Sequence, residues 1–253
     1  MMRAVALLLV LLAALSAAAE ERVVVGLSED AIAISTDFTG SELLIFGAIK
    51  RAAPPPPGRL DVIVTLAGPS ERVVVRRKAR KYGIWVNDQA VEVDAAPSFY
   101  AVATTRLIGD ILPDTQDLRH RITTERMIRA VGLPDDILDR DAFIEALVRL
   151  REAEGLYGTF PGAVTLREAT LFRTDIAMPA NLVEGAYALR IFLMRDGEVV
   201  DLYETDIAVE KVGLERWLYT LAHERPFRYA LLSLFIAIAA GWLASAAFRL
   251  LPG

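Results

Sequence analysis

The feature that most constrains the fold of this chain is an uncharged apolar stretch near its C-terminus, YALLSLFIAIAAGWLASAAF at residues 229–248. As an α-helix, a segment of this length rises roughly 30 Å, which is the thickness of a bilayer's hydrocarbon core. Apart from the N-terminal leader, no other segment is apolar enough to cross a membrane. We therefore expect a globular body attached to one C-terminal transmembrane helix.

The N-terminal segment 1–19 has the three parts of a secretory signal peptide. Arg3 supplies a positive start, Ala4–Leu15 an apolar core, and Ala17–Ala19 a small-residue cleavage site before Glu20. We expect cleavage after Ala19, and the alternative is an uncleaved N-terminal anchor.

A cleaved leader followed by one membrane helix places the body, from residue 20 to about 225, outside the cytoplasm and the tail 249–253 inside it. The charges beside the helix argue weakly for the opposite orientation. Arg225 and Arg228 precede the helix, and only Arg249 follows it. The expected orientation therefore rests on the signal peptide.

Several classes of chemistry are absent from the sequence. The chain has no cysteine, so an exported body has no disulfides, no thiol catalysis and no thiolate metal site. His120 and His223 are the only histidines, and neither belongs to an HExxH motif or a comparable ligand spacing. There is no GxSxG motif and no glycine-rich phosphate loop. We predict no catalytic residues, no metal and no cofactor, and the net charge of −5 is too small to identify a partner.

The body divides into three regions by the period of its apolar residues. Short apolar or alternating runs separated by turn residues predict β-rich regions at 20–112 and 158–213, and a helical period predicts a helical hairpin at 113–157 between them. A juxtamembrane segment at 214–228 leads to the membrane helix. We predict a mainly β fold with one or two immunoglobulin-like β-sandwiches and this helical insertion.

Local signals make more detailed predictions. Asp196-Gly197 suits a type I′ hairpin turn, and Asn87–Gln89 reads as a second hairpin turn. A first helix should run from about Leu118 to Gly132, and Asp141 should cap a second one. The strand pairs expected around Asp196-Gly197 are Arg195–Glu198, Leu193–Val200 and Ile191–Leu202.

Small residues recur at every fourth position of the membrane helix and form one stripe. Such stripes let a second helix backbone approach closely, so we interpret this one as a helix-packing face, while chance spacing in an alanine-rich helix is the alternative. The residues of the stripe are Ser233, Ala237, Gly241 and Ser245.

The most basic run of the chain lies at residues 76–81. Export excludes nucleic acid as its partner. We expect a solvated strand edge protected by charge, and the alternative is a surface contact with anionic headgroups or an acidic partner. The cations are Arg76, Arg77, Lys78, Arg80 and Lys81.

Trp85, Phe99 and Tyr100 are the aromatic residues of the predicted strands that follow the basic run. Large aromatic side chains on strands usually fill a sandwich core, and we expect that here. The alternative is that they line a ligand surface.

Three composite stretches carry a resemblance to a known family. They are DFTG followed by LIFGAI at 37–49, GIWVN followed by PSFYAV at 83–102, and LFR, PAN and EGAY between 171 and 187. With the C-terminal helix, they resemble the putative transmembrane protein family of alphaproteobacteria, whose members have no established activity. The resemblance implies an inner-membrane protein with a periplasmic β-rich body, and it implies no reaction and no site residues.

These observations lead to three hypotheses for function. The first is a non-enzymatic accessory protein, anchored once in the inner membrane, that contacts a membrane transporter or an envelope assembly. The alternative is a tethered periplasmic module that binds a soluble ligand or an envelope polymer. The third is a hydrolase whose sequence carries no nucleophile–base signature, and a deep cleft lined by paired carboxylates would favour it.

Overall fold

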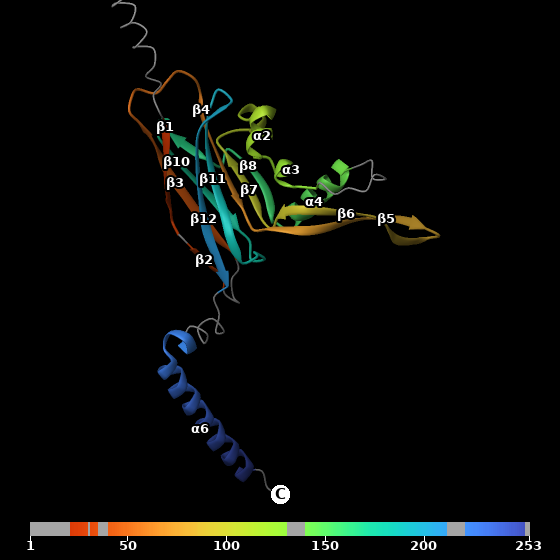
Figure 1. The fold of residues 1–253 in the computed structure, drawn as a ribbon, viewed down its shortest axis with the longest axis vertical. Helices are drawn as coiled ribbons and strands as arrows, with labels where there is room; N and C mark the ends of the chain where they lie inside the picture. The colour runs from red at the N-terminus through yellow and green to blue at the C-terminus, as the bar shows by residue number, and fades with distance from the viewer. Residues whose placement is uncertain (1–20, 30, 35–39, 131–139, 212–220, 251–253) are drawn as a thin grey trace, which may run out of the picture. The chain divides into compact units, whose positions relative to one another are not determined.

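A computed structural model describes most of the chain in two units, a β-rich body that extends to Val209 and a C-terminal helix (Figure 1). The described residues are 21–29, 31–34, 40–130, 140–211 and 221–250. The predicted signal peptide, the predicted helix end at Gly132, the first part of the juxtamembrane segment and residues 251–253 lie outside them.

The first sheet of the body has four strands, in the spatial order β1 (Glu21–Leu27), β3 (Ser41–Arg51), β10 (Leu171–Met178) and β9 (Thr165–Arg167). Along β10 every second side chain is buried. This alternation shows that one face of the sheet packs inward while the other faces solvent.

The second sheet has six strands. Their spatial order is β2 (Ala31–Ile34), β12 (Glu198–Lys211), β11 (Gly185–Arg195), β4 (Leu60–Ala67), β7 (Tyr100–Thr104) and β8 (Tyr157–Pro161). The ladders from β12 to β7 are antiparallel, and β7 and β8 are parallel. All residues of β4 and β7 are buried, so the centre of this sheet is covered on both faces.

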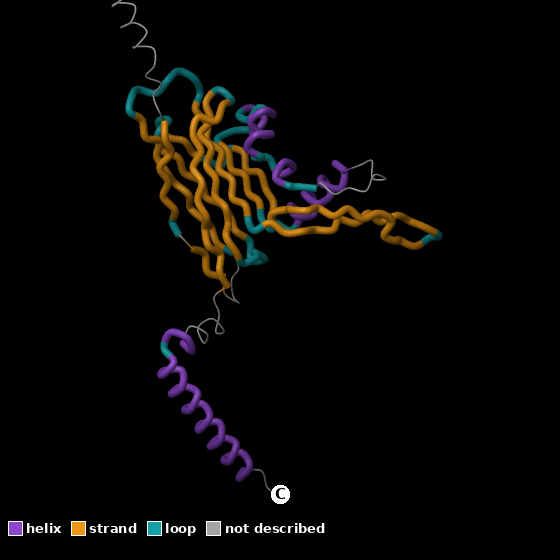
Figure 2. The backbone as a smooth tube through the Cα atoms, viewed as in Figure 1, coloured by secondary structure: helices purple, strands orange, loops and turns teal. Residues whose placement is uncertain are grey.

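One cover is the first sheet, and the other is the helical region between β7 and β8 (Figures 1 and 2). The amide of Val23 in the first sheet donates to Asp201 Oδ2 in the second at 2.6 Å. On the opposite face, Tyr100 donates its hydroxyl to the carbonyl of Ile122 at 2.6 Å. The predictions of a mainly β fold, a sandwich and a helical insertion are confirmed, while an immunoglobulin-like connectivity stays a prediction.

The predicted first helix is wrong in one respect, because two short helices replace it. They are α2 (Asp114–His120) and α3 (Thr124–Met127), after a 3₁₀ turn at Ile108–Asp110. Asp117 accepts hydrogen bonds from the amides of Ile122 and Thr123, both at 2.9 Å, and from the Thr123 hydroxyl at 2.7 Å. This buried carboxylate turns the chain at Arg121, which is left-handed with φ 52°, and ends the helix there.

The predicted second helix is present as α4 (Arg140–Ala153), so Asp141 lies inside its first turn rather than before it. Phe143 and Leu147 are buried, and Val148 beside them is also buried. The helix α4 packs against α3, β8 and the base of a long hairpin.

That hairpin consists of β5 (Ser70–Lys81) and β6 (Ile84–Pro97), which pair with each other along their length (Figure 1). At its base, Ala95 of β6 also forms an isolated antiparallel bridge with Arg129. It continues the β4–β7 ladder beyond the second sheet. The ladder between β11 and β4 starts at Ala188–Ala67, and the one between β7 and β8 starts at Tyr100–Tyr157. Beyond these pairs the ladders to β11 and β8 end, so β5 and β6 project from the sheet together.

One of the two predicted hairpin turns is present in the structure and the other is not. The turn at Asn87–Gln89 is wrong: these residues lie inside β6 at a register shift, and the hairpin turns at Tyr82-Gly83. At Asp196-Gly197 the turn is confirmed, with φ of 49° and 85°, and Arg195 pairs with Glu198.

The register beyond the Met194–Val199 pair differs from the prediction because of an irregularity at Leu193/Met194. One extra residue on β12 shifts all later partners by one position. Leu193 therefore pairs with Asp201 instead of Val200, and Ile191 pairs with Tyr203 instead of Leu202.

The second unit contains α6 (Pro226–Leu250), which includes the predicted span 229–248. Among the described residues it is the single helix long and apolar enough to cross a membrane. Its side chains are almost all exposed in the unit by itself, as expected for a helix whose surroundings are lipid.

Candidate functional site

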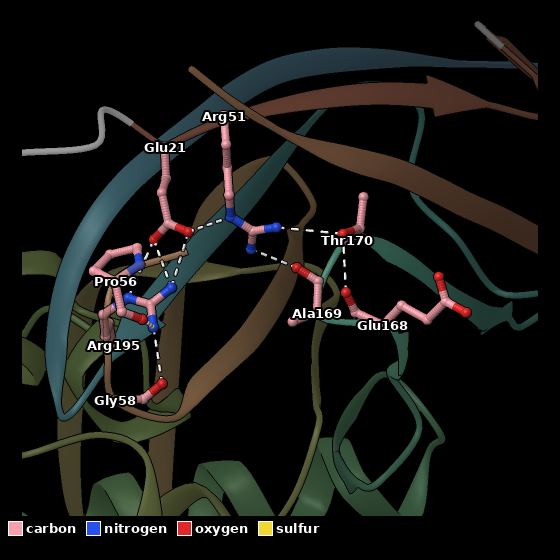
Figure 3. Close-up of polar contacts among 8 residues, drawn as sticks. All are labelled: Glu21, Arg51, Pro56, Gly58, Glu168, Ala169, Thr170 and Arg195. Atoms are coloured by element: carbon pink, nitrogen blue, oxygen red, sulfur yellow. Dashed lines mark hydrogen bonds and ion pairs between the residues drawn. The ribbon is translucent and has the colours of Figure 1, made fainter. Parts of the chain in front are cut away.

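A buried ion-pair cluster joins the two sheets at one end of the sandwich (Figure 3). Glu21 on β1 accepts from Arg51 Nε at 2.5 Å and from Arg195 Nη2 at 2.8 Å. The side chain of Glu21 is 3% exposed and each arginine 10%. Burial alone would raise the pKa of Glu21, but the hydrogen bonds and charges of the two arginines outweigh it and hold that pKa below its usual range.

Both guanidinium groups of this cluster also donate to oxygen atoms other than those of Glu21. Arg195 Nη1 donates to the carbonyls of Pro56 at 3.0 Å and Gly58 at 2.8 Å. Arg51 donates to the Thr170 hydroxyl at 3.3 Å and to the carbonyl of Ala169. Because the carboxylate is enclosed and both guanidinium groups bind protein atoms, we interpret the cluster as a structural clamp.

A second buried carboxylate, Asp61 on β4, has a similar role. It accepts from Arg106 Nε at 3.0 Å, from Arg106 Nη2 at 2.8 Å and from the Thr105 hydroxyl at 2.7 Å. Burial opposes its ionisation, yet the hydrogen bonds from Arg106 and Thr105 dominate together, so the pKa of Asp61 lies below its usual range. This pair fastens the segment that follows β7 to the sheet.

The described residues contain no group of three or more histidine, aspartate or glutamate side chains arranged to hold a metal ion. A cleft of about 510 Å³ lies between α3 and α4. Four carboxylates and one arginine line it with two other residues. The charged residues are Asp117, Glu125, Asp141, Glu145 and Arg126.

Among the described residues of the body, the β5–β6 hairpin carries the most exposed apolar side chains. Tyr82 is fully exposed, Trp85 is 68% exposed and Ile84 is 64% exposed. The expectation that Trp85 belongs to the sandwich core is therefore wrong, because β6 continues past the sheet that would have covered it. Phe99 and Tyr100, also predicted as core, are buried at 3% and 0%.

The predicted basic run lies on β5 and is exposed at all five of its cations. Lys81 forms an ion pair with Asp88 across the hairpin, and Arg77 donates to Gln89 Oε1 at 3.3 Å. The run therefore forms one strand of a projecting two-stranded arm rather than the edge of a sandwich sheet.

The arm divides into a supported base and an unsupported end. At the base, Arg151 of α4 pairs with Glu71 at 2.6 Å, and Val75, Val91 and Val93 are buried. Between residues 76 and 90, in contrast, no residue is buried. The end of the arm is therefore surrounded by solvent in the isolated body.

A groove of about 360 Å³ lies where the arm meets α4. Arg76, Arg77 and Arg149 contribute three guanidinium groups to its lining, against the one carboxylate of Glu145. The guanidinium carbon of Arg77 lies 4.7 Å from the centre of the Phe143 ring, a cation–π distance that holds this side chain in place. The groove joins two of the predicted cations to α4, which the sequence alone did not connect.

The predicted stripe on α6 is exposed at all four positions, Ser233, Ala237, Gly241 and Ser245. A Cβ atom added to Gly241 would meet no atom within 4 Å. Another helix could therefore reach the stripe, and its role in helix packing stays a prediction.

Comparison with known proteins identifies one family. The family model described as "Putative transmembrane protein (Alph_Pro_TM)" matches residues 22–250. No curated protein and no solved structure matches the chain. The matched range includes both the β-rich body and α6.

Proposed function

Because this chain belongs to the putative transmembrane protein family Alph_Pro_TM, we propose that it is a membrane-anchored accessory protein rather than an enzyme. It presents the β5–β6 arm to a partner protein in an inner-membrane transporter or an envelope assembly. The observation that carries this proposal is the arm itself, a two-stranded hairpin that leaves the sandwich and exposes a basic surface beside a groove.

The proposal includes a location. α6 anchors the protein once in a bacterial inner membrane, the body lies in the periplasm, and residues 249–253 lie in the cytoplasm. Two features support it: the signal-peptide pattern of residues 1–19, and the single apolar helix among the described residues. The resemblance to a family of alphaproteobacterial membrane proteins agrees with both.

The arm suits a protein partner because its base combines charge with a fixed geometry. The ion pair between Arg151 and Glu71 at 2.6 Å orients β5 against α4. The stacking of Arg77 on Phe143 has the same effect. The groove between them then offers the guanidinium groups of Arg76 and Arg149 to an acidic segment of the partner. Arginine favours such contacts because its planar group binds carboxylates bidentately.

The first test is affinity purification of the full-length chain in mild detergent, with co-purifying proteins identified by mass spectrometry. Arg76→Glu with Arg149→Glu should reduce recovery of the partner at least about tenfold, since two charge-assisted contacts are each worth roughly 1.5–3 kcal/mol. The matched control is Lys50→Glu with Arg167→Glu, which reverses two exposed cations on the first sheet and should leave recovery unchanged. Equal recovery with both pairs would contradict a role for the groove.

The alternative function, a tethered ligand-binding module, is favoured by the cleft between α3 and α4. Its volume of about 510 Å³ falls within the range of small-molecule sites, roughly 300–1,000 Å³. Its carboxylates select a cationic ligand. Thermal stabilisation of the full chain by a polyamine, lost in Glu125→Gln with Glu145→Gln, would support this alternative over the first proposal.

A further inference from the structure

The turn at the end of the arm has an unusual composition for its geometry. Tyr82 and Gly83 have φ of 53° and 87°, which is the left-handed pair of a type I′ hairpin turn. Asparagine or aspartate before glycine is the favoured sequence there, because a bulky side chain at positive φ is strained. Tyrosine is a poor choice for the turn itself, so its presence calls for an explanation outside local folding.

Three large side chains gather around this turn. Tyr82 is fully exposed, and Ile84 and Trp85 follow it at the start of β6 with roughly two thirds of their surface exposed. None of them adds to the core of the sandwich. Large apolar side chains concentrated at a projecting end indicate a contact with an apolar environment.

Charge is concentrated at the same end. Residues 76–89 contain five cations and one carboxylate, a net charge of +4, in a chain whose net charge is −5. Lys78, Arg80 and Lys81, the cations closest to the turn, are all exposed. The apolar tip is therefore surrounded by a positive potential that attracts an anionic surface.

We propose that the tip of the β5–β6 arm inserts Tyr82, Ile84 and Trp85 into the headgroup region of an anionic lipid bilayer. Tryptophan and tyrosine favour this depth because each combines an apolar ring with a polar N–H or O–H group. The neighbouring cations then contact acidic headgroups. This inference goes beyond the proposed accessory function, since it requires no partner protein.

A lipid surface fits the tip better than a protein surface does. A standard protein interface buries roughly 800 Å² on each partner, and the narrow end of a two-stranded hairpin offers few side chains for such a contact. Shallow membrane insertion needs only a small amphipathic group combined with basic residues. In addition, α6 keeps the chain on a membrane, so lipid is present at a high local concentration.

The cysteine-free sequence allows a direct test on the full chain. Ile84→Cys, labelled with the apolar, environment-sensitive fluorophore nitrobenzoxadiazole, is reconstituted into liposomes of phosphatidylcholine alone or with phosphatidylglycerol. We expect emission at shorter wavelength, and quenching by lipid-borne nitroxide, only when phosphatidylglycerol is present. The same label at Ala180→Cys, on an exposed loop of the body, should show neither change.

Two tip variants separate insertion from folding. Tyr82→Asn suits the type I′ turn better than tyrosine, so it preserves the hairpin while it reduces the quenching. Trp85→Ser should reduce the quenching further, and high salt should weaken it because the headgroup contacts are screened.

Identical emission with and without phosphatidylglycerol, and no lipid quenching at Ile84→Cys, would overturn the proposal. It would also be overturned if the spectral change required addition of a partner protein rather than anionic lipid. Neither result depends on the groove at the base of the arm, so failure here leaves the accessory function testable by its own variants.

Discussion

Replacement of Glu21 by glutamine tests whether the buried cluster holds the two sheets together. Glu21 accepts four hydrogen bonds from two guanidinium groups, at 2.5 Å from Arg51 Nε and at 3.2, 2.9 and 2.8 Å from Arg195. Glutamine keeps the size of the side chain, but it removes the charge and turns one acceptor into a donor that faces other donors.

The expected cost follows from this geometry. The substitution leaves two arginines, each 10% exposed, without a compensating carboxylate. Removal of one partner from a buried ion pair costs about 3–5 kcal/mol. In a body of this size each kcal/mol lowers the melting temperature by about 2–4 °C, so Glu21→Gln should lower it by about 10 °C.

The measurement is thermal unfolding of the full chain in mild detergent, followed by near-ultraviolet circular dichroism. This signal reports the packed aromatic residues of the body and avoids the large helical signal of α6. Glu29→Gln, which removes an exposed carboxylate from the same end of the chain, is the control and should change the melting temperature little.

The effect should depend on pH in a defined direction. The folded-state pKa of Glu21 lies below its unfolded value of 4.5. Its stabilising contribution is therefore complete above about pH 4.5 and is lost as the pH falls through the folded-state pKa. The wild-type and Glu21→Gln melting temperatures should converge in acid and differ at neutral pH.

A triple variant tests whether the cost comes from the buried charges. Glu21→Leu combined with Arg51→Met and Arg195→Met removes all buried charges together and should unfold closer to wild type than Glu21→Gln does. A loss below about 1 kcal/mol in Glu21→Gln at neutral pH, or a difference that persists unchanged in acid, would refute the clamp interpretation.

Three further predictions concern other parts of the chain. Gly47→Ala should destabilise the body by about 1–3 kcal/mol in the same assay, because the new Cβ lies 2.4 Å from an aromatic carbon of β10, whereas Gly109→Ala meets no atom within 4 Å. Asp117→Ala should cost about 2–4 kcal/mol, since two backbone amides at the α2–α3 turn lose their acceptor; protease cleavage between α2 and α3 should accelerate. Ala237→Leu with Gly241→Leu should release a membrane partner in the affinity purification while the near-ultraviolet spectrum is unchanged, and an intact complex would exclude the stripe as its contact.

The candidate site was only partly predictable. The cations at 76–81 form a visible basic run, and Asp196-Gly197 predicts the turn between β11 and β12. Both signals lie within a few neighbouring residues of the sequence. Trp85 was assigned to the core because a strand pattern does not reveal whether a second layer covers it. The groove was missed because Arg149 is distant in sequence from Arg76 and reaches it only through the packing of α4 on β5.

The apolar C-terminal helix, the mainly β body and the helical insertion can all be predicted from the sequence alone. These features follow from local properties of the sequence: an uncharged 20-residue run, a two-residue alternation and the residue types of the turns. Such local signals favour a helix, a strand or a turn without reference to distant residues. Tertiary packing makes β5 and β6 project as an arm, because the projection depends on where β11 and β8 stop pairing with β4 and β7. It likewise decided that Glu21 is enclosed by Arg51 and Arg195, since a buried charge is stable only where distant strands bring its partners to it.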